Sequence, residues 1–515
     1  MAGDHFDVAI IGAGLSGVGA ACRLQKACPS KTYAILEGRE DLGGTWDLFR
    51  YPGVRSDSDM FTLSYPFRPW THAKAIARGR SILTYIRDTA REYGVDQKIR
   101  FGHRLRAASW SSAEARWTLE VERGPEREVV RLSCGFLIMC AGYYAYEDGY
   151  SPTFPGVARF RGRIVHPQHW SPDVDYVGKR VVVIGSGATA ITLAPELAKR
   201  AAHVVMVQRS PSYVIERPSS DGFADALRAA LPERLAYRLA RWKNILIGAY
   251  FYRFCRRNPQ SAKWLLLSRV RDALDPNYDV ATHFTPPYDP WEKRLCVVPD
   301  GDLFRAIRNR RASVVTGRIE TFTESGVALS DGQEIEADLV VTATGLVLQP
   351  LGGVRLSVDG AAVDLGKTLT YKGAMLSGVP NLASVFGYAN ASWTLKADLI
   401  CQYVCRLLNH MEARGYRQCA PRADDAPASS APLIDLEAGH FQRAPGQLPR
   451  QGLKWPWRWR QDYARDVLAL KFGRIADDAL RFSPPRASRR NGRVGQGAEP
   501  PSRDRNGAER DAAAG

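Results

Sequence analysis

Two glycine-rich turns are the residues of this sequence best suited to chemistry, because glycine lets a backbone approach phosphate groups closely. The first turn, GAGLSG at residues 12–17, follows the β-branched run VAII and precedes a helix-like segment. Glu37 follows Gly17 by 20 residues (37 − 17 = 20), where a carboxylate binds the hydroxyls of an unphosphorylated ribose. The cofactor contacts expected here are Gly12, Gly14, Leu15, Ser16, Gly17 and Glu37.

The second turn, GSGATA at residues 185–190, follows the run VVVI. Here Arg209 stands 22 residues after Gly187 (209 − 187 = 22), near the place that an acid takes in the first turn. A guanidinium suits a 2′-phosphate and not a bare ribose, so this site is expected to prefer NADPH to NADH. The contacts expected here are Gly185, Ser186, Gly187, Ala188, Thr189, Arg209 and Ser210.

The first site thus offers a carboxylate to a free ribose, and the second offers a guanidinium to a 2′-phosphate. Together the two dinucleotide sites predict an enzyme that uses a flavin and a nicotinamide, in which hydride passes from NADPH to FAD. The nine cysteines contain no CxxC pair, which argues against a disulfide reductase and suits a reducing cytoplasm. Oxygen, a quinone or another small molecule is then left as the electron acceptor. No metal site is expected.

The elements that must position these turns occur twice along the chain. Each nucleotide turn is followed later by an apolar strand that ends in small residues, FLIMCAGYY at 136–144 and DLVVTATG at 338–345. This doubling predicts an α/β fold of two Rossmann-like dinucleotide-binding domains, the second inserted into the first. We expect the first part of the FAD domain at 1–149, the NADP domain at 150–347 with a helical insertion at about 220–285, the return of the FAD domain at 348–482, and a disordered tail at 483–515.

Two further segments are predicted to form neither a helix nor a strand. Residues 43–67, which hold three glycines, two prolines and several aromatic side chains, read as a long ordered loop beside the first site. Such a loop is expected to cover an isoalloxazine ring, or else to be a structural loop packed by Trp46 and Tyr51. The run FRGRIVHPQHWSP at 160–172 reads as neither strand nor helix and joins the two halves.

That joining run resembles the FxGxxxHxxxW signature of the Baeyer–Villiger monooxygenases, which are class B flavin-dependent monooxygenases. VVVIGSGATA, QRSP, RLCVVP and GYANASWTLKADL add to the resemblance, which spans about residues 5–482 and is nearest to the actinobacterial branch that activates ethionamide. The signature residues here are Phe160, Gly162, His166 and Trp170.

The resemblance also implies roles for residues outside the nucleotide turns. GGTW resembles the flavin-side motif of the family, and YPGVRSD places Asp57 near the reactive edge of the flavin. EKRLC places Arg294 against the flavin peroxide and Lys293 on the 2′-phosphate, with Asp57 expected to orient Arg294 through a charge-assisted hydrogen bond. The further contacts expected are Gly44, Thr45, Trp46, Asp57, Tyr65 and Lys293, with Arg294 and Asp57 as catalytic residues.

In this family a C4a-peroxyflavin inserts one atom of O2 into hydrophobic ketones to give esters or lactones, with oxidation of sulfides or thioamides as a second activity. The resemblance therefore implies a hydrophobic ketone or a sulfur compound as the small-molecule partner, besides O2. Two alternatives stay open: a monooxygenase that mainly oxidises nitrogen or sulfur, and an NADPH oxidase that releases hydrogen peroxide. A flavoprotein used only as an interaction module is a third.

The formal net charge of +17 is compatible with nucleic acid, anionic lipid or anionic cofactors as partners. No nucleic-acid motif is present, so no nucleic-acid partner is expected. No apolar run reaches the roughly 18 residues that span a bilayer, and a cytoplasmic protein is expected. Residues 238–257 mix basic, aromatic and aliphatic side chains, which indicates either peripheral contact with the inner face of the cell membrane or a packed helical insertion. The oligomeric state is left open.

Overall fold

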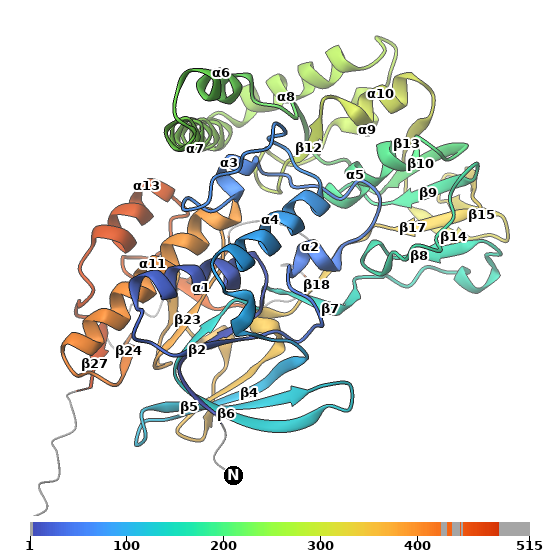
Figure 1. Cartoon of the computed structure of the whole chain (residues 1–515). Helices are drawn as coiled ribbons and strands as arrows, with labels where there is room; N and C mark the ends of the chain where they lie inside the picture. Colours follow the sequence, from blue (N-terminus) through green and yellow to red (C-terminus); the bar gives the residue numbers. More distant parts are fainter. Residues whose placement is uncertain (1–3, 424–429, 435–442, 444–445, 484–515) are drawn as a thin grey trace, which may run out of the picture.

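Two β-sheets, one in each half of the molecule, carry the fold (Figure 1). The computed structural model describes residues 4–423, 430–434, 443 and 446–483 of the 515-residue chain. The tail expected to be disordered lies outside these residues, apart from Ser483.

The first sheet has the strand order β20-β19-β4-β5-β6-β1-β2-β3, with β23 paired to the end of β6. Strands β23, β6, β1, β2 and β3 run parallel to their neighbours in this set. The strands are β1 (His5–Ile11), β2 (Tyr33–Leu36), β3 (Ile99–Arg100), β4 (His103–Ser111), β5 (Arg116–Arg123), β6 (Glu128–Met139), β19 (Arg355–Val358), β20 (Ala361–Ala362) and β23 (Leu382–Ser384).

Strand β1 shows why this sheet is buried on both faces. Its alternate residues Val8 and Ile10 pack in the cluster that holds the helices, whereas Ala9 and Ile11 pack in the cluster of β4 and β5. Because successive side chains of a strand point to opposite faces, an unbroken apolar run is what such a strand needs. The helices of this half are α1 (Leu15–Ala27), α2 (Thr45–Leu48), α3 (Met60–Leu63), α4 (Gly79–Glu92) and α11 (Trp393–Ala413).

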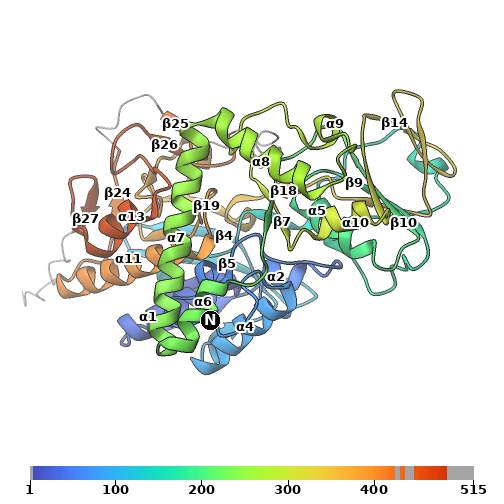
Figure 2. The ribbon, with the colours of Figure 1, turned by 90° about the horizontal axis from the view of Figure 1, so that it is seen from above.

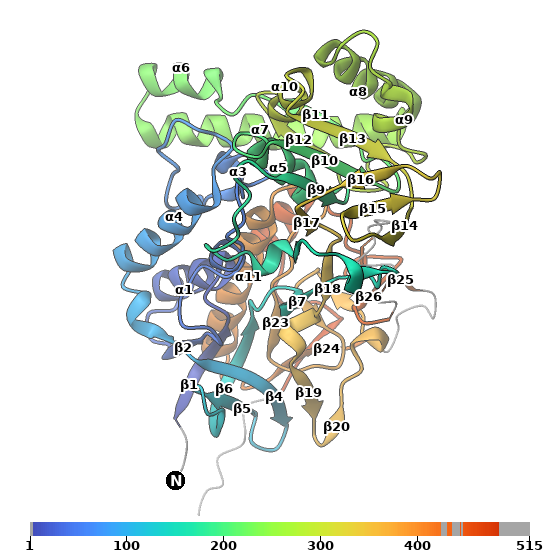
Figure 3. The ribbon, with the colours of Figure 1, turned by 90° about the vertical axis from the view of Figure 1, so that its right-hand side faces the viewer.

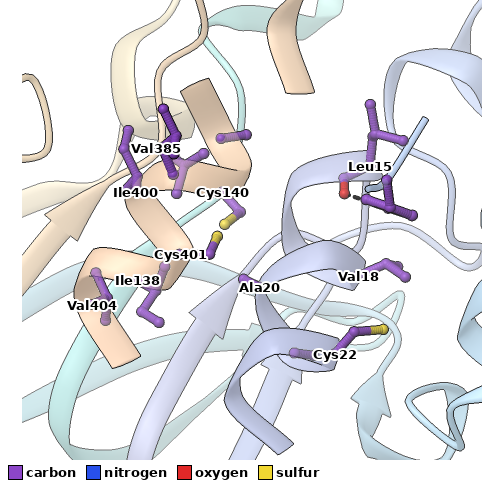
Figure 4. Packing of buried hydrophobic residues seen from close by; sticks show 14 of the residues in the cluster. Leu15, Val18, Ala20, Cys22, Ile138, Cys140, Val385, Ile400, Cys401 and Val404 are labelled. Carbon is purple, nitrogen blue, oxygen red and sulfur yellow. Dashed lines mark hydrogen bonds between the residues drawn. The ribbon is translucent and has the colours of Figure 1, made fainter. Parts of the chain in front are cut away.

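Helices α1 and α11 come from opposite ends of the chain and pack on the same face of the sheet. Figure 4 shows their side chains around Ile138 and Cys140, with the Cys140 and Cys401 side chains pointing toward one another. Arg23 on α1 donates two hydrogen bonds to the Asp398 carboxylate on α11, at 2.7 and 3.1 Å. This ion pair holds α11 against α1.

The second sheet is entirely parallel, in the order β13-β10-β9-β17-β8. A three-stranded meander and a two-stranded parallel pair accompany it. The elements are β8 (Arg163–Val165), β9 (Arg180–Ile184), β10 (His203–Gln208), β13 (Ala312–Thr316), β17 (Leu339–Thr342), β14 (Ile319–Phe322), β15 (Gly326–Leu329), β16 (Glu334–Glu336), β11 (Val214–Arg217), β12 (Cys296–Pro299), α5 (Ala188–Leu197) and α10 (Asp302–Arg308).

Two of the segments read as irregular contain short regular elements. Residues 163–165 form β8, the edge strand of the second sheet, so the reading of 160–172 as neither strand nor helix was wrong. The loop at 43–67 likewise contains the one-turn helices α2 and α3. Elements of three or four residues are too short to show a hydrophobic period, which explains both errors.

The chain passes between the halves through two adjacent strands, β7 (Tyr144–Gly149) and β18 (Leu346–Leu348). They pair antiparallel, with Leu346 opposite Gly149. Figure 3 shows both strands between the two sheets. The second half therefore leaves and returns at one place, which confirms two Rossmann-like units with the second inserted into the first.

A helical segment lies over the second half and reaches back to the first (Figure 2). It contains α6 (Gly222–Ala230), α7 (Glu233–Arg257), α8 (Pro259–Ala273) and α9 (Val280–Phe284). Seen from above in Figure 2, α7 crosses the molecule and passes close to α13. Within the described residues, no helix is both long and apolar enough to cross a membrane.

The last part of the chain adds short strands and turns around α11. They are β21 (Thr370–Tyr371), β22 (Met375–Leu376), β24 (Cys419–Pro421), β25 (Ser430–Pro432), β26 (Arg450–Gly452), β27 (Leu480–Phe482), α13 (Tyr463–Asp466) and a π-helical turn at Val467–Phe472. The buried Asp466 carboxylate accepts hydrogen bonds from Lys396 of α11 and from Tyr388, which holds this segment on the core. The other short helical turns in the described residues are Asp96–Lys98, Val157–Arg159, Pro167–His169, Pro350–Gly353 and Leu365–Lys367.

Arg241 on α7 provides a test of how the helical segment is attached. Its buried guanidinium donates to the carbonyl oxygens of Phe61 and Ser64, at 2.6 and 2.9 Å, around the end of α3. Arg241→Met leaves these carbonyls without their donor, so we expect the free energy of unfolding to fall by about 2 kcal/mol or more. The thermal unfolding midpoint measures the loss. The exposed Arg238→Met is the control, and equal midpoints for the two variants would contradict the prediction.

Candidate active site

A cavity of about 360 Å³ opens where β1, β2 and β6 end and α1 begins. The carboxyl edge of a parallel sheet is where doubly wound folds bind ligands. Eight of the contacts expected from sequence line this cavity: Gly12, Gly14, Leu15, Ser16, Glu37, Gly44, Thr45 and Trp46. Gly17 and Tyr65 are not part of the lining.

Each glycine of the first turn is explained by a different geometric constraint. Gly12 has a φ of +98°, and a Cβ there would lie 2.7 Å from the Cys140 carbonyl oxygen. A Cβ on Gly17 would lie 1.8 Å from the carbonyl oxygen of Gly12, so this glycine is needed for packing. A Cβ on Gly14 would meet only Gly44, at 3.5 Å, so the space before Gly14 is open to a ligand. This open cradle fits a pyrophosphate.

Glu37 lies at the end of β2 with both carboxylate oxygens engaged. Its oxygens accept hydrogen bonds from the Ala13 and Arg39 backbone N–H groups, at 2.7 and 3.0 Å. Burial raises the pKa of Glu37, and these two hydrogen bonds oppose that shift. Each carboxylate oxygen has more than one acceptor position, so Glu37 can still receive ribose hydroxyls from the cavity.

An aromatic wall completes the cavity, and the sequence interpretation did not assign it. Tyr143 stacks on Trp393 with 5.3 Å between ring centroids and 8° between planes. The Trp393 indole donates to the Ser16 hydroxyl at 2.9 Å. Tyr144 and Tyr146 line the same cavity. The strings CAGYY and GYANASWTLKADL contain Tyr143, Tyr144 and Trp393, but only the fold brings Trp393, 377 residues away, to Ser16.

The loop at 43–67 contacts both halves of the molecule. Tyr65 donates to the Leu15 carbonyl at 2.5 Å, and its ring fills the space beside Gly19, so it supports α1 from below. Tyr51 is buried in the core of the second half, in the cluster that holds Ala190 and Ile191 of α5. The loop therefore packs on both halves of the molecule and also lies beside the cavity.

The second glycine turn joins β9 to α5 in the other half. Gly185 has a φ of +140°, and a Cβ there would lie 2.4 Å from the Ala343 carbonyl oxygen. A Cβ on Gly187 would meet nothing within 4 Å, which leaves a second open cradle. Ala188 and Thr189 begin α5, and Ser186 accepts a hydrogen bond from Ser212. Arg209, which is exposed, and Ser210 follow β10 directly, at the same edge of the sheet.

Lys293 and Arg294 lie on a segment that runs beside this second turn. The Cys296 thiol contacts the Ser186 carbonyl at 3.9 Å, and the Lys293 ammonium lies 4.6 Å from the centre of the Tyr288 ring. Lys293, three residues before Cys296, therefore lies on the segment that contacts the second cradle.

The charge of Arg294 reaches the first cavity as well. It lowers the pKa of Asp57 and of Tyr143 and Tyr144, although burial, the larger effect, raises the pKa of all three. The side chain of Arg294 is exposed. Its charge therefore acts on Asp57 in the loop at 43–67 and on the aromatic wall, while Cys296, two residues along the same segment, contacts the second glycine turn.

Asp57 does not hold Arg294 in the way the sequence suggested. Among the described residues, which include both, there is no hydrogen bond or ion pair between Asp57 and Arg294, so the expected direct contact is absent. Burial raises the pKa of Asp57, while Arg294 and then Arg55 oppose the shift. Arg55 is itself ion-paired with Asp302. Asp57 and Arg294 therefore interact through their charges without direct contact.

The signature residues divide between the second core and the crossing strands. Phe160 is buried in the second half, and a Cβ on Gly162 would lie 2.5 Å from its ring. Trp170 packs beside Tyr176. The Nε2 of His166 lies 3.2 Å from the Gly345 carbonyl oxygen, just before β18, and its ring fills the space beside Gly149 at the end of β7.

Two open dinucleotide cradles, one in each half of the molecule, are typical of an oxidoreductase that uses a flavin and a nicotinamide. The family model of flavin-binding monooxygenase-like proteins matches residues 6–350. The chain is also 50% identical over 481 residues to the FAD-containing monooxygenase EthA of Mycobacterium tuberculosis H37Rv, which covers 93% of this chain and 98% of that protein. It belongs to the flavin-binding monooxygenase-like family and is a flavin monooxygenase.

Solved structures share this fold. An oxidised steroid monooxygenase bound to NADP superposes with a TM-score of 0.68 at 24% identity, over 81% of this chain and 88% of that one. A complex of OTEMO with FAD and NADP gives 0.69 at 20% identity, over 93% and 99%. At these identities the likeness shows the architecture alone, and it agrees with the two Rossmann-like units.

The two kinds of glycine predict opposite outcomes on substitution. Gly187→Ala places its Cβ in open space, so we expect an unchanged thermal unfolding midpoint but an NADPH affinity reduced by about tenfold or more. Gly17→Ala forces a Cβ against the Gly12 carbonyl, so we expect lower stability and loss of flavin. Calorimetric titration with NADPH and thermal unfolding separate the two. Wild-type NADPH affinity in Gly187→Ala would show that the second cradle is not a pyrophosphate site.

The raised pKa of Asp57 predicts a pH-dependent cost in stability. Between its usual value of 3.8 and its raised value, the folded protein binds more protons than the unfolded chain, so stability falls as the pH rises through this range. Asp57→Asn removes the cost. We expect the variant to melt above the wild type at pH 7, with the difference closing toward pH 4. A wild type that is the more stable protein at pH 7 would contradict this.

Proposed function

We propose that this protein is an FAD- and NADPH-dependent monooxygenase that inserts one oxygen atom from O2 into hydrophobic ketones, giving esters or lactones. Oxidation of sulfides or thioamides is its second activity. The observation that carries the proposal is the place of Arg294, whose charge acts on Asp57 and on the aromatic wall, and whose segment contacts the second glycine turn through Cys296. A single cation so placed can act on oxygen chemistry beside the first cavity while the nicotinamide is bound to the second cradle.

The charged residues that would contact the two riboses support the assignment of FAD to the first cavity and NADPH to the second cradle. Glu37 offers carboxylate oxygens at the first cavity, which suits the adenosine ribose of FAD, whereas Arg209 suits the 2′-phosphate of NADPH. Lys293, near the second cradle, would add a second cation for that phosphate. The relative EthA is described as FAD-containing, and the OTEMO complex holds FAD and NADP.

When bound, FAD would take hydride from NADPH and supply activated oxygen. The residues of this chain would orient and protect that chemistry. The guanidinium of Arg294 stays charged at any working pH, so it would stabilise negative charge that develops on oxygen near the reacting carbonyl. The stacked pair of Tyr143 and Trp393 would bound a flat slot and exclude water. Asp57 would hold Arg294 toward the slot through charge.

His166 and Trp170 would act as hinge or latch residues in this scheme, because the nicotinamide must first deliver hydride and then make room for substrate. Both lie at the crossing between the halves or beside it, and neither needs to touch the substrate. The domain boundaries near residues 150 and 347, where β7 ends and β18 lies, belong to the same proposal.

The test uses the purified flavin-loaded protein with NADPH, O2 and a long-chain methyl ketone, with mass spectrometry of the product. We expect an ester one oxygen heavier than the ketone, formed in step with NADPH consumption. Arg294→Ala should keep FAD and lower kcat by about 10²- to 10³-fold. Arg131→Ala, an exposed arginine on the outer part of β6, is the control and should leave kcat unchanged.

The alternatives give different products in the same assay. Oxygenation of a sulfide or amine without any ester would indicate a nitrogen- or sulfur-oxygenating enzyme. Hydrogen peroxide in amounts equal to the NADPH consumed, with every substrate offered, would indicate an oxidase. Wild-type ester formation by Arg294→Ala would remove Arg294 from the proposal.

A further inference from the structure

Helix α7 exposes a continuous apolar stripe on the side away from the core. Leu235, Leu239, Trp242, Leu246 and Tyr250 follow one another in steps of 4, 3, 4 and 4 residues, which places them on one face of the helix. Soluble proteins seldom expose large contiguous apolar patches without a partner. The exposed fractions are 44% for Leu235, 43% for Leu239, 45% for Trp242, 62% for Leu246 and 73% for Tyr250, with Ile247 at 54% beside them.

The opposite face of α7 already packs on the rest of the protein, so the exposed stripe is not the face with which the helix packs on its own domain. Tyr237 and Arg241 bond to the backbone around α3, and Ala236, Ala240 and Ile245 are buried. The helix is therefore held on the loop that leads from the first cavity, with its apolar stripe turned outward. A helical insertion that only packs on its own domain would explain the buried face of α7 but not the exposed apolar stripe.

The charges on α7 identify the kind of partner. Its only acidic residue is Glu233, at the first position, whereas arginines flank the stripe and its C-terminal end. The exposed arginines are Arg234, Arg238, Arg253, Arg256 and Arg257. A second copy of this chain is a poor occupant, because two stripes face to face would bring these arginines together without acids between them. An apolar surface bordered by arginines suits anionic lipid headgroups above hydrocarbon.

We propose that the outer face of α7 docks on an anionic lipid bilayer, with the helix lying in the plane of the interface. At 25 residues α7 is about 37 Å long, so its apolar side chains would enter the headgroup boundary along the whole length. The seven basic residues of the helix prevent it from crossing the bilayer. This inference does not depend on the proposed reaction.

The surface beside the stripe has the same character. Arg253 of α7 pairs with Asp462 at 2.7 Å, and Trp242 lies 5.9 Å from Tyr463, so α13 borders the stripe. The turn after α13 exposes Leu468 and Phe472, each at 66%. Exposed cations, among them Arg465 and Lys471, accompany them. The docking face therefore extends from α7 onto the segment that follows α13.

The test is flotation of the flavin-loaded full chain with phosphatidylcholine vesicles, with and without phosphatidylglycerol. We expect flotation with the anionic vesicles, weakened by salt. Leu239→Ser/Leu246→Ser should lose it, whereas Val129→Ser/Val177→Ser, a matched exposed pair elsewhere, should float like the wild type.

The charged part of the surface has its own variants. Arg256→Gln/Arg257→Gln should weaken binding by on the order of fivefold for each arginine, and Arg127→Gln/Arg310→Gln should not weaken it. Flavin content and product turnover in solution show that each variant is folded. Trp242→Phe keeps the packing, and it should reduce the part of the tryptophan emission that brominated lipids quench.

Three results would overturn the proposal. The first is a wild type that stays unbound to anionic vesicles at low salt, and the second is a Leu239→Ser/Leu246→Ser variant that floats as the wild type does. The third is a dimer in light scattering that the same two substitutions dissociate while wild-type flotation is absent, since a second copy would then cover the stripe.

Discussion

The structure depends on the place where the chain crosses twice between its halves. The paired strands β7 and β18 make the crossing, and the ring of His166 fits against both of them. Its Nε2–H donates to the Gly345 carbonyl, and its Nδ1 accepts from the Gln168 backbone. Each nitrogen of a neutral imidazole is thus used once, and burial lowers the pKa of His166, which keeps the ring neutral. Gln168 extends the contact by donating to the Ala145 and Tyr146 carbonyls of β7.

The arrangement of the site follows from that crossing. With the halves held there, Tyr51 from the first half is buried in the core of the second unit, and the charge of Arg294 from the second unit acts on Tyr143 in the aromatic wall of the first. Neither interaction lies within one Rossmann-like unit. A shift of one half against the other would change both together, which is the behaviour that a reaction with successive hydride delivery and oxygen transfer requires. Helix α7, held on α3 by Arg241, rests on this same loop.

Much of the fold was predictable because its signals are local. A β-branched run, a GxGxxG or GxGxxA turn and a charged residue about twenty positions later describe one βαβ unit, and this pattern occurs twice. The wall formed by Tyr143 and Trp393 was not predictable, since residues 250 positions apart stack only once α11 is packed on α1. The missing bond between Asp57 and Arg294 has a similar cause, because sequence motifs give residue types but not distances. Residues 163–165 form a strand through partners at 339–341 and not through their own pattern.

The coupling of NADPH consumption to oxygenated product in His166→Ala tests the central role of the crossing most directly. His169→Ala is the control, because His169 lies on the same turn but is exposed. We expect His166→Ala to keep its FAD while the product formed per NADPH falls and hydrogen peroxide rises, with His169→Ala unchanged. Coupling in His166→Ala equal to that of the wild type would contradict the account, because the two halves would then keep their working arrangement without the residue that joins the crossing strands.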